Sequence, residues 1–457
     1  MNSYFISQSL YEGDGGKKNL MPMFIFFLAV NIALLLRLSL FKEFNVDEFE
    51  HLHAAWNASV GSVPFKDFFQ HHNVLFIYFL EPLFWFVDES SFILVVARCL
   101  MFSVSLGILY MSYIIARRLL GFEAALFSLI LLTSFNIFIN PFLEIRPDVL
   151  QTFFGLVSFY FLLVWIEDRK DGQMVLCGFF YSVSFFFLQK ALFFLPVLFL
   201  IFLFYTDKDK WILKVSKGIL FFITGCVPSL IVLFSYLLLH DNIKEYFVMN
   251  YLINSQQLGN FAQNLEAYSV FTTSVMDQNY IVWGMAFIGT CLLFFKKGRE
   301  KVLLLAPIII LLLTIRLLKN PWRQYYMQVA PFICMAATLV LYPILVQLIH
   351  DFKPVTKKVF TFIFFFILLA QPIYDNYLNE LSATNVGQLE KTQFVLDNSK
   401  KEDLFFSLRR SYNIYRKNIV FNWYDIGYSK SLFSRLGMKT YSKDPSSLII
   451  NSKPKII

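Results

Sequence analysis

The sequence is dominated by apolar runs that are long enough to cross a membrane. A spanning helix needs about 17–25 apolar residues, and a soluble domain carries near a quarter charged residues. Only 16% of this 457-residue chain is charged, and 57% is hydrophobic. We therefore predict a polytopic α-helical membrane protein. About eleven spans are expected, near residues 20–41, 92–116, 122–142, 149–166, 173–189, 191–205, 218–239, 279–295, 302–318, 326–349 and 359–374.

The basic residues indicate how these spans are oriented. The chain has a formal net charge of +8, and its basic clusters fall in short breaks between apolar runs, which is typical of cytoplasmic loops. With a cytoplasmic N-terminus, every such cluster comes out in the cytoplasm, and we expect an integral protein of a bacterial inner membrane. Nucleic-acid binding is excluded because no basic face with interleaved aromatic residues occurs. The clusters are Lys17-Lys18, Arg117-Arg118, Arg169-Lys170, 208–217, 296–301 and 353–358.

The same alternation divides the chain into two units. Residues 1–372 form the transmembrane unit, with a first outer loop at 42–91, and residues 373–457 form a small extracytoplasmic α/β domain of mixed charge. The first apolar run lacks a small-residue cleavage site, so we expect a retained span. All five cysteines lie in or beside apolar runs without a CxxC pattern, which favours core packing over disulfides or zinc.

The first outer loop is unusually polar for this chain. It holds four of the six histidines together with several acids. Placed on a helical wheel from Asp47, its first part has an apolar stripe with acids on the other face. This pattern predicts an interfacial helix with its apolar side toward the membrane and its acids toward water or protein. A second short interfacial helix is expected near 75–87. The stripe is Phe49, Leu52, Trp56 and Val60, and the opposite face carries Asp47, Glu50 and His51.

Three further polar positions map to the same outer side. Arg146 and Asp148 lie in the turn between two spans, Lys190 follows Gln189 at an outer boundary, and Arg98 lies about 9 Å inside its span at 1.5 Å per residue. An arginine at membrane depth usually has a partner or a ligand. Cations that converge with the Asp47-Glu48 pair suit a lipid phosphate, with a carboxylate to take a proton from an attacking hydroxyl.

Each position also has a simpler interpretation. Asp47 and Glu48 could be first-turn acids that the helix dipole favours. Arg146 and Asp148 could form a local pair in a tight turn, and Lys190 could extend its amine to the interface. The shared location of these positions on one membrane face favours a joint site.

Together these residues resemble a known family. The acidic pair at Asp47, the stretch G-x-x-P-F-x-D-F-F-Q-H-H from Gly61, Arg98, and R-P-D from Arg146 are similar to the GT-C glycosyltransferases. The narrower likeness is to protein O-mannosyltransferases and bacterial lipid A aminoarabinose transferases. It extends over 21–205 and is weaker at NPWRQYYMQVAPF (320–332). It implies a GT-C fold, interfacial helices in the first loop and a polyprenyl-phosphate sugar donor.

The resemblance also implies roles for individual residues. Asp47 matches the general base or acceptor-site carboxylate, and Glu48 matches its catalytic partner. The cations expected at the donor phosphate are Arg98, Lys190 and Arg146. Arg323 and Tyr325 match donor-side contacts. We expect a supporting role, or a place in the acceptor site, for Asp148, His51, His71, His72, Arg323 and Tyr325.

The histidines depart from the family pattern. Glu50, His51 and His53 could hold a divalent ion, although the resemblance requires no cofactor. Hydrogen-bonding histidines are the alternative.

The function expected is an inverting glycosyltransferase on the extracytoplasmic face. It would move a sugar from a polyprenyl phosphate to a hydroxyl or phosphate of a glycolipid, glycan or protein, in contact with membrane lipids. A transporter or flippase of a lipid-linked or anionic solute, with Arg98, Glu81 and His71-His72 as a relay, is the alternative, but transporters place charges near the midplane. A polysaccharide polymerase or ligase is disfavoured because 241–278 holds only Lys244 as a basic residue.

Overall fold

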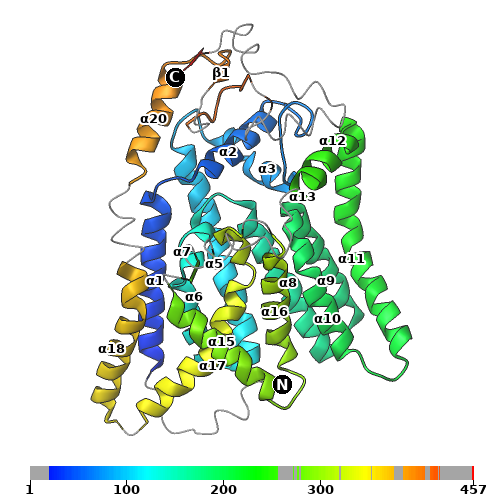
Figure 1. The fold of residues 1–457 in the computed structure, drawn as a ribbon. Helices are drawn as coiled ribbons and strands as arrows, with labels where there is room; N and C mark the ends of the chain where they lie inside the picture. The colour runs from blue at the N-terminus through cyan, green and yellow to red at the C-terminus, as the bar shows by residue number, and fades with distance from the viewer. Residues whose placement is uncertain are drawn as a thin grey trace.

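The structure is a computed structural model in which each expected span coincides with a helix or a helix pair. It describes residues 20–255, 271, 275–276, 279–318, 321–350, 352–374, 384–406, 412–419, 421 and 455–456. The long helices run side by side, and shorter helices cover one end of the bundle (Figure 1). The protein is thus a helical membrane protein, as the apolar runs predict.

Five of the described helices are long and apolar enough to cross a membrane on their own. A sixth candidate is the pair formed by α6 (Phe122–Thr133) and Asn136–Leu143, which is bent by 61°. The run 122–142 was expected as one span, so the bend is a departure from that expectation. The five are α1 (Met21–Phe41), α5 (Ile93–Leu120), α8 (Pro147–Asp168), α11 (Trp211–His240) and α17 (Ala330–Leu348).

The remaining expected spans coincide with other helices, and the number of crossings stays a prediction. These helices are α9 (Asp171–Phe187), α10 (Leu195–Tyr205) with η3 (Gln189–Phe193) before it, α15 (Tyr280–Phe295), α16 (Val302–Arg316) and α18 (Pro354–Ile373). The short elements are α3 (Leu75–Leu80), α4 (Leu83–Phe86), α7 (Asn136–Ile139), η2 (Pro141–Leu143), α12 (Ile243–Phe247), η4 (Val248–Leu252), α13 (Ile253–Ser255) and η7 (Arg323–Tyr326).

Small residues let α9 and α11 approach closely. A Cβ atom at Gly178 would lie 1.9 Å from the carbonyl oxygen of Phe222, and one at Gly225 would lie 2.0 Å from that of Val175. Small residues at such crossings allow backbone contact between helices in a membrane.

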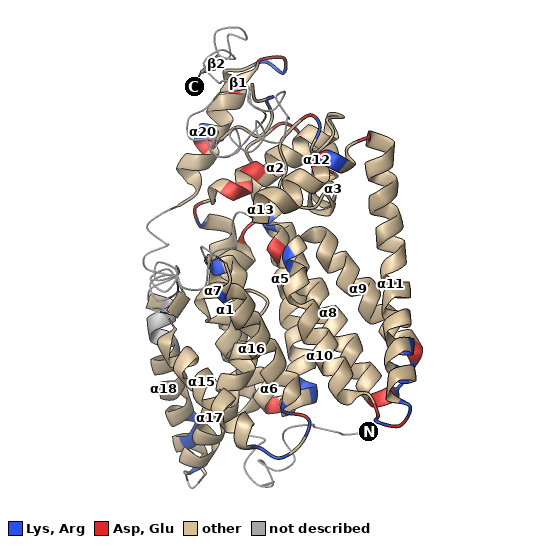
Figure 2. Ribbon diagram, turned by 45° about the vertical axis from the view of Figure 1, so that its right-hand side comes forward, with Lys and Arg blue, Asp and Glu red and all other residues tan. Residues whose placement is uncertain are grey.

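Charged residues gather at the two ends of the bundle and leave its middle apolar (Figure 2). The connection between α10 and α11, where the basic cluster 208–217 begins, lies at the end opposite α2 (Val46–Ser59) (Figure 1), in agreement with the alternation expected from sequence. Lys17-Lys18 lies outside the described residues. Which end faces the cytoplasm stays a prediction.

The helix α2 forms where the first interfacial helix was expected, and most of it is buried. Residues Glu48 to Asn57 are all buried, so its polar face lies against protein, which is one of the two surroundings expected for it. The reason is a cover from far along the chain: Tyr412 packs edge-on against Phe49, with ring centroids 5.5 Å apart. The second expected helix is divided into α3 and α4 at Glu81 and Pro82.

The C-terminal region packs on the same end of the bundle. Its described part contains α20 (Val386–Asp397), and β1 (Phe405–Phe406) pairs in parallel with β2 (Lys455–Ile456). The backbone N–H of Asn385 donates to the carbonyl of Phe41 at 3.0 Å, which ties α20 to the end of α1. Most of 407–457 lies outside the described residues, so the expected domain boundary stays a prediction.

Candidate active site

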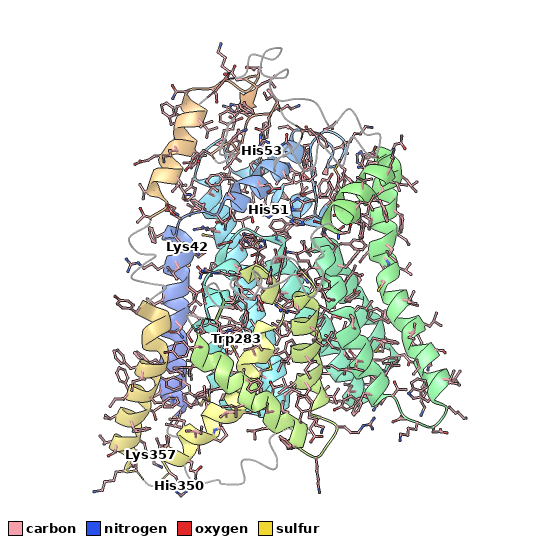
Figure 3. All side chains as sticks on the ribbon, in the orientation of Figure 1. Lys42, His51, His53, Trp283, His350 and Lys357 are labelled. Carbon is pink, nitrogen blue, oxygen red and sulfur yellow. The ribbon has the colours of Figure 1, made fainter. Side chains whose placement is uncertain are left out.

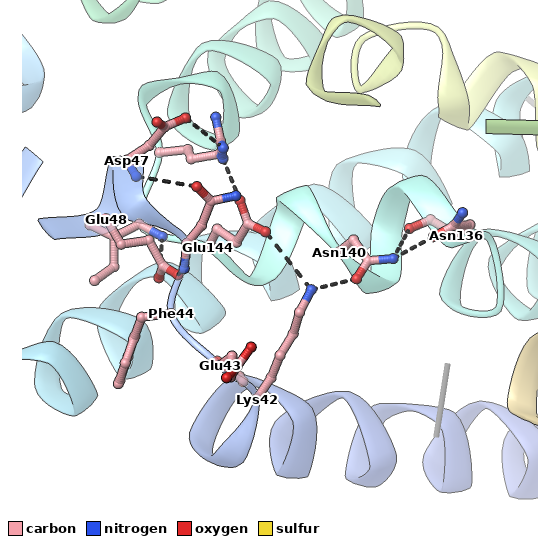
Figure 4. A network of polar contacts seen from close by, with 12 residues as sticks. Lys42, Glu43, Phe44, Asp47, Glu48, Asn136, Asn140 and Glu144 are labelled. Atoms are coloured by element: carbon pink, nitrogen blue, oxygen red, sulfur yellow. Dashed lines mark hydrogen bonds and ion pairs between the residues drawn. The ribbon is translucent and has the colours of Figure 1, made fainter. Parts of the chain in front are cut away.

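Asp47 is the starting point of a network of charged and amide groups at the covered end of the bundle (Figure 4). Its carboxylate lies 2.7 Å from Nη2 of Arg146, and its side chain is 21% exposed. Arg146 also donates through Nε to Glu144, and Lys42 Nζ lies 3.8 Å from Glu144. Lys42 donates onward to Asn140. Arg146 is therefore part of this network and does more than form a local pair within its turn.

The electrostatics of this turn are strongly coupled. Burial alone would lower the pKa of Arg146, but Glu144, Asp47 and Asp148 together raise it above its usual value. Burial alone would raise the pKa of Glu144, but Arg146 and Lys42 hold it below its usual value. The guanidinium thus stays charged next to Asp47.

Glu48 serves a different purpose from Asp47. Its side chain is completely buried and makes two hydrogen bonds with Arg98, of 2.6 and 2.8 Å. It also accepts from the backbone N–H of Ile145 at 3.0 Å and from that of Asn45 at 2.8 Å. The last bond belongs to a capping box in which the Asn45 side chain accepts from the backbone of Asp47. Glu48 therefore joins the start of α2 to α5 and to the Arg146 turn.

Arg98 does not offer its charge to a ligand in this structure. It is 1% exposed, and besides Glu48 it donates to the backbone carbonyls of Ser39, Lys42 and Glu43. Phe44 covers its guanidinium at 4.0 Å from the ring centroid. The expected phosphate contact is thus corrected: a buried charge is tolerated only when it is paired and hydrogen-bonded, and Arg98 meets that condition within the protein.

Lys190 lies on η3 beside the same network. Its Nζ is 3.1 Å from Oδ1 of Asp148 and 4.0 Å from the centroid of the Tyr325 ring. Its side chain is 24% exposed, whereas that of Asp148 is 5% exposed. Arg323 begins the same short helix as Tyr325, and within the described part of the chain it makes no side-chain hydrogen bond or ion pair. Lys190 therefore keeps an accessible charge near the site.

Three histidines and Glu50 form a second group next to Asp47. The His71 and His72 rings are 3.9 Å apart, the His51 and His72 rings are 5.9 Å apart, and Nδ1 of His71 lies 3.9 Å from Glu50. Burial lowers the pKa of His51 to about 3 although Asp47 opposes the shift, and it lowers that of His71 to about 4. Burial likewise holds the pKa of His72 well below its usual value.

His53 is separate from this group. Its Nδ1 and Nε2 each lie 3.0 Å from a C-terminal partner, the carbonyl of Ile414 and the amide of Asn418 (Figure 3 shows His51 and His53 on α2). Because both ring nitrogens are engaged, the expected Glu50–His51–His53 metal set does not converge. Among the described residues, no group of three histidine, cysteine or acidic side chains is arranged to hold a metal ion.

Two residues of the network, Lys42 and Glu144, were not assigned a role from sequence. Lys42 directly follows the first expected span on its outer side, against the usual bias of basic residues toward the cytoplasm. That position is the signal that could have identified it. Glu144 precedes Arg146 by two residues but carries no pattern that predicts its partner.

The comparisons with known proteins agree with the family resemblance. A family model described as dolichyl-phosphate-mannose-protein mannosyltransferase matches residues 71–233. That range includes His71, Arg98, Arg146 and Lys190 but not Asp47. No curated protein matches the sequence.

Solved structures extend the likeness to most of the chain. ArnT from Cupriavidus metallidurans bound to undecaprenyl phosphate matches with a TM-score of 0.61 at 12% identity, over 86% of this chain and 84% of that one. The archaeal oligosaccharyltransferase AglB from Archaeoglobus fulgidus, in complex with an inhibitory peptide and a dolichol-phosphate, matches with a TM-score of 0.56 at 10% identity. That match covers 84% of this chain and 59% of AglB. The protein therefore has the GT-C fold and resembles the branch of protein O-mannosyltransferases and lipid A aminoarabinose transferases.

Proposed function

We propose that the protein is an inverting glycosyltransferase that moves a sugar from a polyprenyl-phosphate donor to an acceptor at the extracytoplasmic face. One observation carries this proposal. Asp47 is the partly exposed acid of the network; it is paired with Arg146 and lies four residues before the buried His51 on α2. The fold supports it, because ArnT has the same fold and was crystallised with undecaprenyl phosphate.

The proposed reaction uses Asp47 as the general base. The acceptor oxygen attacks the anomeric carbon on the side opposite the phosphate, and the bond from that carbon to the phosphate oxygen breaks. The electron pair leaves with the polyprenyl phosphate, and the acceptor proton passes to Asp47. Lys190 and Arg146 offset the charge of the leaving phosphate, and Arg323 supplies a further cation. A base of this kind contributes about 10²- to 10⁴-fold in rate.

Arg98 and Glu48 take a positioning role in this scheme. Their ion pair, buried under Phe44, fixes the first turn of α2 against α5. The Glu48 bond to the Ile145 N–H fixes the Arg146 turn to the same helix start. Asp47 and Arg146 are thereby held at hydrogen-bonding distance before any substrate binds, which is the kind of support that a reactive group requires.

The transporter alternative is not favoured. The relay expected for it includes Arg98, whose guanidinium is fully engaged within the protein. The charged residues also gather at the two ends of the bundle and not at its middle (Figure 2), whereas transporters bind their substrates near the midplane.

The proposal is tested in a strain that lacks the gene. The strain is complemented with the wild type, with Asp47→Asn, or with Asp67→Asn as a control from an exposed position of the same loop. Mass spectrometry of envelope glycolipids, glycans and glycoproteins should show one sugar restored by the wild type and by Asp67→Asn. Asp47→Asn should reach normal membrane abundance without restoring it. Full restoration by Asp47→Asn would exclude Asp47 as the base.

A further inference from the structure

In the group formed by Glu50, His51, His71 and His72, the imidazoles of His51 and His72 have unused hydrogen-bonding capacity. Within the described part of the chain, neither His51 nor His72 makes a side-chain hydrogen bond, and Nδ1 of His72 is buried without a partner. His51 is 4% exposed and Glu50 is 5% exposed. Buried polar atoms are normally hydrogen-bonded, so imidazoles left in this state at the edge of a proposed active site point to a ligand.

The group lies directly beside the reacting acid. The charges of Asp47, Arg146 and Lys190 all act on the His51 ring, and those of Asp47 and Lys190 act on His71. His51 follows Asp47 by four residues on α2, so the two side chains are neighbours on one face of that helix. The cations are assigned to the donor phosphate, so the histidines are available to bind the acceptor.

The charges around the histidine group disfavour an anionic acceptor. The histidines are neutral at pH 7 because burial opposes their protonation, and Glu50 and Asp47 add negative charge. Arg146 and Lys190 are already assigned to the donor phosphate, so a second phosphate would meet the charge of the donor phosphate and of Glu50. The ion pairs are Arg98–Glu48, Arg146–Asp47, Arg146–Glu144, Lys42–Glu144 and Lys190–Asp148.

Neutral imidazoles instead match hydroxyl groups. A neutral imidazole offers one N–H donor and one nitrogen acceptor, and a hydroxyl likewise donates and accepts. Several imidazoles close together suit adjacent hydroxyls, which a sugar ring presents and a serine or threonine side chain does not. The Phe69 ring is stacked on His71 with centroids 5.7 Å apart, which extends the aromatic lining of this side.

We propose that Glu50, His51, His71 and His72 form the acceptor subsite, and that this subsite takes the uncharged hydroxyls of a sugar and not a phosphate. The inference rests on the proposed function, because it assigns the second substrate of the same reaction. It narrows the acceptor from a hydroxyl or phosphate of a lipid, glycan or protein to a glycan hydroxyl.

The first test determines the linkage of the sugar that depends on Asp47. We expect an O-glycosidic bond to another sugar, which survives mild acid, as established by NMR of the purified envelope glycan. A sugar that mild acid releases while a phosphate monoester stays on the acceptor, or a sugar on serine or threonine, would overturn the acceptor assignment and leave the proposed transferase intact. If no sugar depends on Asp47, the proposed function itself fails.

The second test separates the acceptor side from the donor side with the full-length protein in detergent. Undecaprenyl phosphate is the donor-site probe, and its binding is measured by intrinsic tryptophan fluorescence. We expect His72→Leu to bind the probe within about twofold of the wild type. Sugar transfer in cells should fall at least about tenfold, because the acceptor hydroxyl loses its hydrogen-bond partner. Lys190→Ala should instead lose probe affinity.

Two further variants keep this test decisive. His72→Gln retains an amide that can donate and accept, so it should keep more transfer than His72→Leu even if the leucine variant folds poorly. His240→Gln, on α11 outside the site, is the matched control and should behave as the wild type. Wild-type transfer by His72→Leu, or loss of probe affinity equal to that of Lys190→Ala, would contradict the assignment.

Discussion

At the scale of single residues, the adjacent acids Asp47 and Glu48 have unlike surroundings. Successive side chains on an α-helix point about 100° apart, so the two carboxylates face different neighbours. Glu48 faces α5 and pairs with Arg98 in a fully buried position, whereas Asp47 faces the turn before α8 and stays partly exposed. The acidic pair is therefore one structural residue and one candidate catalytic residue.

The different surroundings predict different effects of neutralising each acid. Glu48→Gln leaves Arg98 as a buried charge without its carboxylate, and breaking such a pair costs about 3–5 kcal/mol of stability. We expect a lower thermal unfolding midpoint of the detergent-purified protein and less protein in the membrane. Asp47→Asn, the matched control one residue away, should keep both near wild type. Equal stability of the two variants would contradict the assignment.

Lys190 provides a test of the donor side. Its amine is stabilised by Asp148 and by the Tyr325 ring, and a cation over an aromatic face is retained when arginine replaces lysine. We expect Lys190→Ala to weaken undecaprenyl phosphate binding at least about tenfold. The affinity of Lys190→Arg should lie between those of Lys190→Ala and the wild type. Lys66→Ala, at an exposed position of the first outer loop, is the control. Unchanged binding by Lys190→Ala would show that the amine merely reaches the interface.

Some residues of this network were singled out from sequence, but Lys42, Glu144 and the pairing of the side chains were not. Asp47, Arg146 and Lys190 all lie where the topology places them, at one end of the bundle. The partner of Arg98 was not predictable, because Glu48 is 50 residues away and no periodicity links the two positions. The same holds for His53, whose partners come from the C-terminal region.

At the scale of elements, apolar length predicts where helices form but not where they break. The run 122–142 is apolar almost throughout, yet α6 ends at Thr133. The chain bends there because the backbone N–H of Asn136 donates to Oδ1 of Asn279 at 2.6 Å, a contact with α15's N-cap residue. Such tertiary partners satisfy backbone groups that a bend frees in a membrane, and they leave no trace in hydropathy.

The α9–α11 contact gives a prediction for a single methyl group. Gly225→Ala places a Cβ atom 2.0 Å from the Val175 carbonyl, so the helices must separate and the protein should lose stability. Gly172→Ala, in the first turn of α9, meets nothing within 4 Å. There the usual helix preference of about 1 kcal/mol for alanine over glycine applies. Unfolding midpoints should therefore move in opposite directions, and a shared direction would contradict the close packing.

At the scale of the whole molecule, burial of α2 depends on both ends of the chain. The transmembrane bundle lies beneath it, and residues 412–419 cover it through His53 and Phe49. Arg416 strengthens this cover by donating to Glu89 at 3.0 Å. His51 and His53 on α2 are consequently buried, and His71 and His72 are partly buried. These four histidines predict how the stability of the whole protein responds to pH.

The protein should lose stability as the pH falls through the ordinary range of histidine. Burial lowers the pKa of His51 to about 3 and those of His53 and His71 to about 4, from 6.5. Between these values the unfolded chain binds more protons than the native protein, so the free energy of unfolding rises with pH. Each histidine contributes up to about 1.4 kcal/mol per pH unit in that window.

We expect the unfolding midpoint of the detergent-purified protein to be steady above about pH 7, because the histidines are then neutral in both states, and to fall steeply from pH 6.5 toward pH 4. His53→Gln removes one of these groups without touching the proposed acceptor subsite, so it should flatten the decline although it lowers stability at pH 7.5. His240→Gln should leave the slope unchanged. A midpoint that is independent of pH between 7 and 5 would mean that water reaches these imidazoles, and the dry surroundings assigned to the histidine group would then be wrong.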